Sequence, residues 1–281
     1  MFLILNTMVW APNIKQITIS APDIARKAQP GQFVMLRVND NGERIPLSIV
    51  DTDQNVGTIT LVFKESGKST IELGSLEQGD NVLDLAGPLG RASEITKLGK
   101  VICVGEGVEV ASIYPIARAL KESGNEVVSI ISADTKQNLI LSQEMKEISD
   151  EIFIATEDGS EGQKGRSSDL LKQLLEKDTD IDLVMAIGSF AMMKDVSEIT
   201  RPYKIPTRVS LHTIMVDGIG MCGSCRVSVD NIIKFACVDG PEFDGHLVDW
   251  NTVQQRVSMF ATEEQLALEK VHAGGGCRCQ K

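Results

Sequence analysis

The chain has 281 residues and a formal net charge of −11, and 42% of its residues are apolar against 24% charged. Such a composition suits a globular protein with a sizeable core, and the length favours two domains over one. The acidic excess, with no basic tract to offset it, argues against nucleic acid as a partner. No apolar run reaches the roughly 18 residues of a membrane span, and the apolar segment 1–10 lacks the positive charges of a signal peptide. We therefore expect a cytoplasmic protein that does not bind a membrane.

Residues 1–96 have the pattern of a β-domain. Short runs rich in β-branched and aromatic residues cover 3–5, 14–19, 32–38 and 58–64. Proline and glycine pairs such as Pro30-Gly31 separate the runs, as turns do. Several strands at this spacing predict a small antiparallel barrel, in which we expect no helix of more than two turns.

Strand and helix patterns alternate over residues 97–207. Apolar runs typical of buried strands cover 101–104, 127–132, 152–155 and 183–187. Helical patterns cover 110–122, 139–148 and 168–177. This alternation predicts an α/β domain with a doubly wound parallel sheet. In its first strand, Cys103 is expected to act as a small core residue.

The last quarter of the chain holds five of the six cysteines. Residues 208–250 return to strands and glycines and contain three of these cysteines. Residues 251–281 contain a predicted helix at 262–272, whose start has the capping-box pattern of Thr262 and Gln265. Cys277 and Cys279 follow, where we expect a mobile tail, with a second metal site as the alternative.

The strongest chemical motif is the spacing of Asp217, Cys222, Cys225 and Cys237. Four residues separate the first two, two residues separate the next pair, and eleven precede the last. Plant-type two-iron clusters have these short gaps, with cysteine at the first position. Glycines between the ligands would let the loop wrap closely around a cluster. The spacing predicts a C-terminal [2Fe–2S] segment, while a zinc site or a buried pair of free cysteines remains an alternative.

A glycine turn marks the predicted nucleotide site. Gly105-Glu106-Gly107 ends the first strand of the α/β domain and opens a helix, where a dinucleotide pyrophosphate would meet the helix N-terminus. The third glycine of the G-x-G-x-x-G pattern is absent, so a structural turn is the alternative. Asp134, near the end of the second strand, would repel a 2′-phosphate and favours NAD(H) over NADP(H), although Lys136 offsets part of that repulsion.

Two weaker motifs lie in the barrel. Pro46-Leu47-Ser48 and Gly67-Lys68-Ser69-Thr70 each follow a predicted strand, and both kinds of sequence are common in turns. The second is not a P-loop, because the earlier glycine of that motif is missing. A hydroxyl and backbone N–H groups at Ser69 and Thr70 could still bind a pyrophosphate.

The order of barrel, nucleotide sheet and two-iron loop resembles the ferredoxin–NADP⁺ reductase superfamily. More closely, it is similar to the electron-transfer subunits of dihydroorotate dehydrogenase and to the small subunits of NADH-dependent reduced ferredoxin:NADP⁺ oxidoreductase, an electron-bifurcating transhydrogenase. The resemblance covers residues 1 to about 250. Its landmarks are Pro30 to Phe33, Pro46 to Ser48, Gly67 to Thr70, Gly87 to Gly90, Thr156 to Gly159, Gly188 with Met192 and Met193, and the cluster motif.

The resemblance implies cofactor sites in all three parts of the chain. FAD would contact Arg44, Pro46, Leu47, Ser48, Val62, Phe63, Lys64, Gly67, Ser69 and Thr70. NAD(H) would contact Gly105, Gly107, Val108, Asp134, Thr156, Glu157, Asp158, Gly159, Gly188 and Met192. The [2Fe–2S] cluster would be held by Asp217, Cys222, Cys225 and Cys237. NADH would reduce the flavin by hydride transfer and the cluster would take single electrons, so no side chain is assigned a catalytic role.

The resemblance also implies a partner. Electrons would pass to a larger flavo-iron–sulfur subunit in a heterodimer, where ferredoxin and NADPH act. Two departures from the family pattern stand out: Arg44 lies four residues before Ser48 where three are usual, and Asp217 replaces a cysteine. Relatives of the dihydroorotate type have four cysteines, so the aspartate favours the bifurcating enzyme. The alternatives are a dihydroorotate dehydrogenase subunit and a non-enzymatic metal-binding regulator on a degenerate reductase scaffold.

Overall fold

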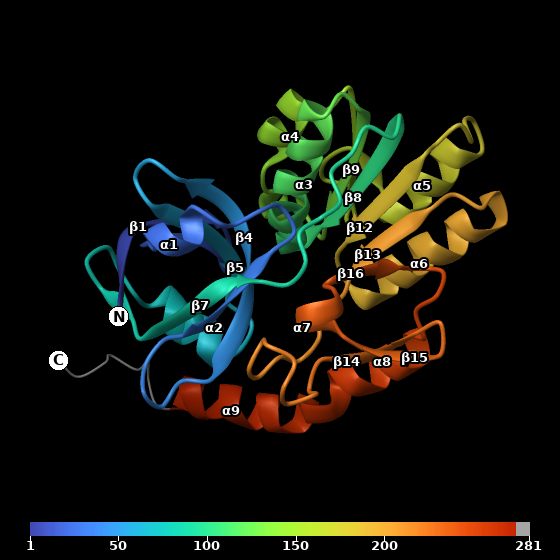
Figure 1. Ribbon diagram of the computed structural model, residues 1–281. Helices are drawn as coiled ribbons and strands as arrows, with labels where there is room; N and C mark the ends of the chain where they lie inside the picture. Colours follow the sequence, from blue (N-terminus) through green and yellow to red (C-terminus); the bar gives the residue numbers. More distant parts are fainter. Residues whose placement is uncertain (274–281) are drawn as a thin grey trace.

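The computed structural model of the protein describes residues 1–273 (Figure 1). The first seven strands form one antiparallel sheet, in the order β6-β1-β2-β5-β4-β3-β7, which curves into a nearly closed barrel. Its strands are β1 (Phe2–Ala11), β2 (Ile14–Ser20), β3 (Phe33–Arg37), β4 (Arg44–Asp53), β5 (Thr58–Lys64), β6 (Asn81–Val82) and β7 (Asp84–Leu89). Helices α1 (Pro22–Ala25) and α2 (Lys68–Gly74) are each no longer than two turns. The predicted barrel is confirmed.

A second, seven-stranded sheet forms the α/β part, in the order β11-β10-β9-β8-β12-β13-β16. Its parallel strands are β8 (Lys100–Glu106), β9 (Glu126–Ala133), β10 (Glu151–Thr156), β11 (Gln163–Lys164), β12 (Leu183–Ile187) and β13 (Thr207–Ser210). The edge strand β16 (Glu242–Asp244) pairs antiparallel with β13, so part of the cysteine-bearing segment completes this sheet.

Helices cover both faces of the second sheet, as predicted for a doubly wound fold (Figure 1). Helices α3 (Val110–Glu122) and α4 (Ser142–Ile148) pack on one face, and α5 (Ser167–Leu175) and α6 (Phe190–Thr200) on the other. Successive strand residues face opposite sides, so Val101 and Cys103 face α3 while Ile102 and Val104 face α5 and α6. Cys103 is fully buried in this core, in agreement with its predicted role.

The remaining described chain forms a small hairpin and three further helices. Its elements are β14 (Arg226–Val229), β15 (Ile232–Phe235), α7 (Ala236–Asp239), α8 (Trp250–Val257), the 3-10 turn η4 (Ser258–Phe260) and α9 (Ala261–Ala273). Three other 3-10 turns, η1 (Gly107–Glu109), η2 (Lys136–Asn138) and η3 (Arg201–Tyr203), belong to the α/β part. Helix α9 passes beneath the barrel next to α2 (Figure 1). Cys277 and Cys279 lie outside the described residues.

Three details of the helix predictions are corrected. Helix α4 begins at Ser142 and not at residue 139, because η2 and a left-handed Leu141 (φ +54°) precede it. Thr262 lies inside α9, which continues from η4, so it does not cap the helix. Helices α6 and α8 were not predicted.

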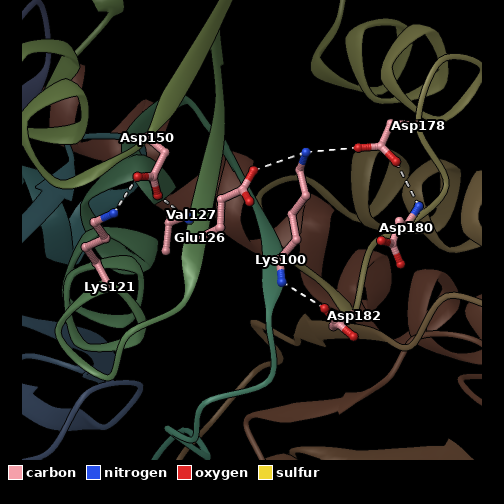
Figure 2. Close-up of polar contacts among 8 residues, drawn as sticks. All are labelled: Lys100, Lys121, Glu126, Val127, Asp150, Asp178, Asp180 and Asp182. Atoms are coloured by element: carbon pink, nitrogen blue, oxygen red, sulfur yellow. Dashed lines mark hydrogen bonds and ion pairs between the residues drawn. The ribbon is translucent and has the colours of Figure 1, made fainter.

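Ion pairs join the amino ends of the central strands (Figure 2). Nζ of Lys100 lies 3.1 Å from Glu126 and 2.9 Å from Asp178, and Nζ of Lys121 lies 2.6 Å from Asp150. Hydrogen bonding to Asp178 raises the pKa of Lys100, and hydrogen bonding to Lys121 lowers the pKa of Asp150. Pairs this exposed contribute little to stability. They lie at the opposite end of the sheet from the strand ends at which α/β proteins bind nucleotides.

Among the described residues, no helix is both long and apolar enough to cross a bilayer.

Candidate flavin, nucleotide and cluster sites

The loop of residues 217–225, here called the cluster loop, lies against the barrel. Gly218 has a φ of +74°, where residues with a Cβ are strained. A Cβ at Gly218 would lie 2.5 Å from Cγ of Met35 on β3 and 2.9 Å from Cδ1 of Leu89 on β7. Both the turn and the close approach to the barrel therefore require glycine here.

The structure arranges the four predicted cluster ligands as two pairs. The Sγ atoms of Cys225 and Cys237 lie 3.2 Å apart, and both residues are buried. The N–H of Cys222 donates to Oδ2 of Asp217 over 2.6 Å, so these two residues are also neighbours. Two sulfurs bound at about 2.3 Å to one tetrahedral metal lie roughly 3.8 Å apart. A small opening of the buried pair would let both sulfurs bind one iron.

This paired arrangement is compatible with a two-iron cluster. A structural zinc site needs four ligands around one point. Within residues 1–273, no three His, Cys, Asp or Glu side chains converge in that way. A two-iron cluster takes two protein ligands on each iron; Cys225 and Cys237 could supply one pair, and Asp217 with Cys222, neighbours through a backbone hydrogen bond, the other.

Local hydrogen bonds and burial set the charge of these ligands. The N–H of Ile219 donates to Asp217 over 2.8 Å and lowers the pKa of its carboxyl group. Hydrogen bonding to Ser224 lowers the pKa of the exposed Cys222. Burial raises the pKa of Cys237 to about 12. A bound cation would offset this effect by stabilising the buried thiolates.

Strand β4 carries the residues predicted to contact the flavin ring. In the β3–β4 ladder, Pro46 lies opposite Met35 and Ser48 opposite Phe33. Met35 is also the residue that Gly218 approaches, so the cluster loop contacts the strand beside the predicted flavin site. Leu47 packs against the barrel core, which leaves its backbone to face a flavin.

Strand β5 sends its three predicted residues in different directions. Val62 packs toward α3, and Phe63 is buried in the barrel core. Lys64 is exposed and lines the cavity beside Gly107. The end of β5 therefore lies between the predicted flavin contacts and the cavity at the strand ends.

The turn before α2 borders a cavity of about 620 Å³. The hydroxyl of Thr70 accepts hydrogen bonds from the N–H groups of Ser66 and Gly67, each over 3.0 Å, and donates to the carbonyl of Gly67. It is therefore committed to shaping the turn. Ser69, only 8% exposed, lines the same cavity, which makes its hydroxyl the better placed of the two to hold a phosphate.

Arg44 lies at the start of β4 in an ion pair. Its guanidinium is 3.5 Å from Oδ2 of Asp84, which Arg37 also contacts at 2.6 Å. Arg44 is not among the residues that line the cavity at α2. It would have to leave Asp84 to reach a phosphate there.

A second cavity, of about 310 Å³, lies at the carboxyl ends of the central strands. It is lined by six of the residues predicted for the cofactors: Lys64, Gly107, Val108, Asp134, Glu157 and Gly188. The N–H of Ser189, at the start of α6, donates to Glu106 over 2.9 Å and joins two strand ends across the cavity. Ligands of open α/β sheets bind at such strand ends.

Five other residues predicted for the nucleotide lie outside the cavity lining. Gly105 lets β8 pack on α3, because a Cβ there would lie 3.1 Å from Cα of Val110. The Thr156 hydroxyl exchanges hydrogen bonds with the backbone of Glu161. The remaining three are Asp158, Gly159 and Met192. Sequence reasoning missed Glu109, Arg166, Phe190 and His212, which line the cavity. Glu109, Phe190 and His212 each lie two or three residues after a strand, and that position could have indicated them.

A barrel of this type, a nucleotide-binding parallel sheet and a cluster loop in one chain define a ferredoxin–NADP⁺ reductase-like oxidoreductase. Residues 212–249 match the iron–sulfur cluster binding domain of dihydroorotate dehydrogenase B. The chain is 45% identical over 260 residues to the dihydroorotate dehydrogenase B (NAD⁺) electron transfer subunit homolog of Thermotoga maritima, covering 92% of each chain. It is 32% identical to the corresponding subunit of Desulforamulus reducens, over 88% of this chain and 97% of the relative. The chain belongs to this family of electron-transfer subunits.

Among solved structures, the chain is similar to one that gives insights into flavin-based electron bifurcation by the NADH-dependent reduced ferredoxin-NADP oxidoreductase. The TM-score is 0.91 and the identity 42%, over 97% of this chain and 98% of the other. These likenesses confirm the predicted resemblance and the predicted cofactors: FAD, a [2Fe–2S] cluster and NAD(H).

Proposed function

We propose that this chain is the NADH-oxidising subunit of an electron-bifurcating, NADH-dependent reduced ferredoxin:NADP⁺ oxidoreductase. It passes electrons to a larger flavo-iron–sulfur subunit, at which ferredoxin and NADPH act. FAD accepts electrons in pairs from NADH and a two-iron cluster carries them singly, so the two cofactors together convert one mode of transfer into the other.

The packing of the cluster loop on the barrel carries this proposal. Gly218 contacts Met35, which pairs across the ladder with Pro46 at the predicted flavin site. On the other side, Lys64 of β5 borders the nucleotide cavity. If these residues bind the cofactors as predicted, the nucleotide, flavin and cluster sites would be neighbours on one barrel, as a short electron path requires.

The side chains of this chain would hold and orient the flavin and the cluster. Ser69 would bind the flavin diphosphate, while Pro46 and Ser48 would bound the ring. Asp217 and Cys222 would hold one iron, and the buried pair Cys225 and Cys237 the other.

The likeness to the bifurcating enzyme, at 42% identity over nearly the full length of both chains, supports this function over that of a dihydroorotate dehydrogenase subunit. Asp217 at the first ligand position supports the same choice. The dihydroorotate alternative retains support from the names of the relatives.

Anaerobic visible spectroscopy of the purified chain, before and after addition of NADH, tests the proposal. We expect flavin and iron–sulfur absorption, both bleached by NADH. A colourless, zinc-containing protein would instead favour a metal-binding regulator.

The partner decides between the two oxidoreductase functions. Reconstitution with the larger subunit should give reduction of NADP⁺ to NADPH. This reduction should require both NADH and reduced ferredoxin as electron donors. If the reconstituted complex oxidises dihydroorotate with NAD⁺ instead, the dihydroorotate alternative is right.

A further inference from the structure

Helix α9 forms one wall of the cavity at the proposed flavin diphosphate site. The opposite wall comes from Ile45 and the turn 66–70 before α2, about 200 residues earlier in the chain. Figure 1 shows α9 running beneath the barrel beside α2. The cavity volume of about 620 Å³ is in the range of small-molecule pockets, roughly 300–1,000 Å³. A diphosphate alone would leave much of this space empty.

The two walls differ in charge. The α2 wall carries Lys68 and the Ser69 hydroxyl, which suit a diphosphate. The α9 wall carries Glu263 and Glu264, whose carboxylates would repel phosphate but accept hydrogen bonds from ribose hydroxyls or an adenine amino group. This asymmetry orients a dinucleotide, with its phosphates at α2 and its adenosine at α9.

Apolar side chains complete the adenosine end. Phe260 and Leu268 line the cavity from the α9 side and Ile45 lines it from the barrel. Leu268 is half-buried, whereas Leu266, on the same helix, is 52% exposed and does not line the cavity. An aromatic base between such side chains would bury apolar surface on both faces.

Helix α9 follows α8 through η4, and α8 is hydrogen-bonded to the cluster loop. Arg256, in the last turn of α8, donates a hydrogen bond from Nη2 to the carbonyl of Ser224 in the cluster loop over 2.7 Å. The six residues 261–266 are all exposed, so α9 contacts the rest of the chain through a narrow face. A ligand in the cavity would add contacts where the protein itself makes few.

We propose that α9 encloses the adenosine half of FAD and thereby gives this chain its preference for FAD over FMN. FMN ends at its phosphate and can use only the α2 wall, whereas FAD reaches α9. The inference rests on the flavin placement in the proposed function.

Binding of FAD and of FMN to the full-length apoprotein tests this inference. Leu268→Asp places a carboxylate at the adenosine end, and should weaken FAD binding about tenfold while changing FMN binding less than about threefold. Leu268→Ala should give a smaller loss in the same direction. Leu266→Asp, the matched control, should bind both flavins as the unaltered chain does. Iron content and NADH affinity of each variant report whether the fold is intact.

Equal losses of FAD and FMN affinity in the two Leu268 variants, or none, would overturn the role of α9. Ser69→Ala separates that failure from a wrong placement of the flavin. The Ser69 hydroxyl faces a phosphate present in both flavins, so its loss should weaken both. If Ser69→Ala weakens both flavins while the Leu268 variants are unchanged, the placement holds and α9 has no role; if none of these variants has an effect, the placement itself is wrong.

Discussion

At the scale of single residues, Lys136 is not free to offset the charge of Asp134. Its Nζ lies 2.8 Å from Oε2 of Glu161, and hydrogen bonding to this carboxylate raises the pKa of Lys136. Asp134 lines the nucleotide cavity, while Lys136 does not. Lys136 therefore does not offset the charge of Asp134, which favours NAD(H); the cations that line the cavity with Asp134 are Lys64 and Arg166.

Replacing Asp134 by asparagine should shift binding toward NADPH. We expect the NADPH dissociation constant to fall about fivefold, because removing one exposed like charge is worth about 1 kcal/mol at most. Adding Glu161→Gln releases Lys136 and should increase the gain. The measurement is titration with NADPH and NADH.

The control for this pair is Asp180→Asn, an exposed change outside the nucleotide cavity. It should leave both dissociation constants unchanged. Tighter binding of NADPH than of NADH by the unaltered chain would contradict the predicted preference.

At the scale of elements, the sequence predicts a helix best where its apolar pattern is regular. A helix whose buried face includes polar side chains is harder to predict from the sequence. Helix α3 was predicted with its observed bounds, 110–122, because its apolar stripe is regular and Gly124 ends it. Helix α6 was missed because its buried face includes Ser197 and Thr200, which break the apolar pattern. Both hydroxyls donate to carbonyls one turn back.

The same distinction applies to the sites. The cluster ligands could be proposed from spacing because three of them lie within nine residues, 217–225. The nucleotide cavity draws Glu109, Arg166 and His212 from three separate segments, and no local pattern connects them. Helix α9 was predicted, but its contact with α2 depends on tertiary packing.

The cluster loop gives a prediction at this scale. Gly218→Ala must place a Cβ 2.5 Å from Met35 at a φ of +74°, so the loop has to move off the barrel. We expect a stability loss of about 1–3 kcal/mol and slower electron transfer from flavin to cluster, with NADH reduction of the flavin unchanged. Denaturant unfolding and stopped-flow spectroscopy measure the two effects.

Gly223→Ala is the matched control for that change. Gly223 has a similar φ of +70°, but a Cβ there would meet only Phe235, at 3.7 Å. It shares the backbone strain and lacks the clash. Equal electron-transfer rates in the two variants would show that contact with Met35 does not matter.

At the scale of the whole molecule, exposed apolar side chains gather on the segment that bears the cluster. Of the 17 large apolar side chains exposed among the described residues, seven lie within residues 212–249: Val216, Ile219, Met221, Ile232, Ile233, Val238 and Leu247. This segment is about one seventh of the chain, so the enrichment is roughly threefold. Exposed apolar side chains, where they gather in one patch, mark protein–protein contacts. We expect the larger subunit to cover it, which would also bring its redox groups close to the cluster.

Charged substitutions on this surface should therefore separate the subunits. Met221→Lys and Ile233→Lys, at side chains 82% and 65% exposed, should each weaken heterodimer formation about tenfold or more, because a desolvated lysine replaces an apolar contact. Calorimetric titration with the larger subunit measures this, and unchanged flavin and cluster spectra show that the chain itself is intact. Val56→Lys, at a side chain 68% exposed in the β4–β5 turn of the barrel, carries the same added charge and should have no effect. If Val56→Lys separates the subunits while the other two variants bind normally, the partner docks on the barrel. Electrons would then have to leave the chain elsewhere than at the surface of residues 212–249.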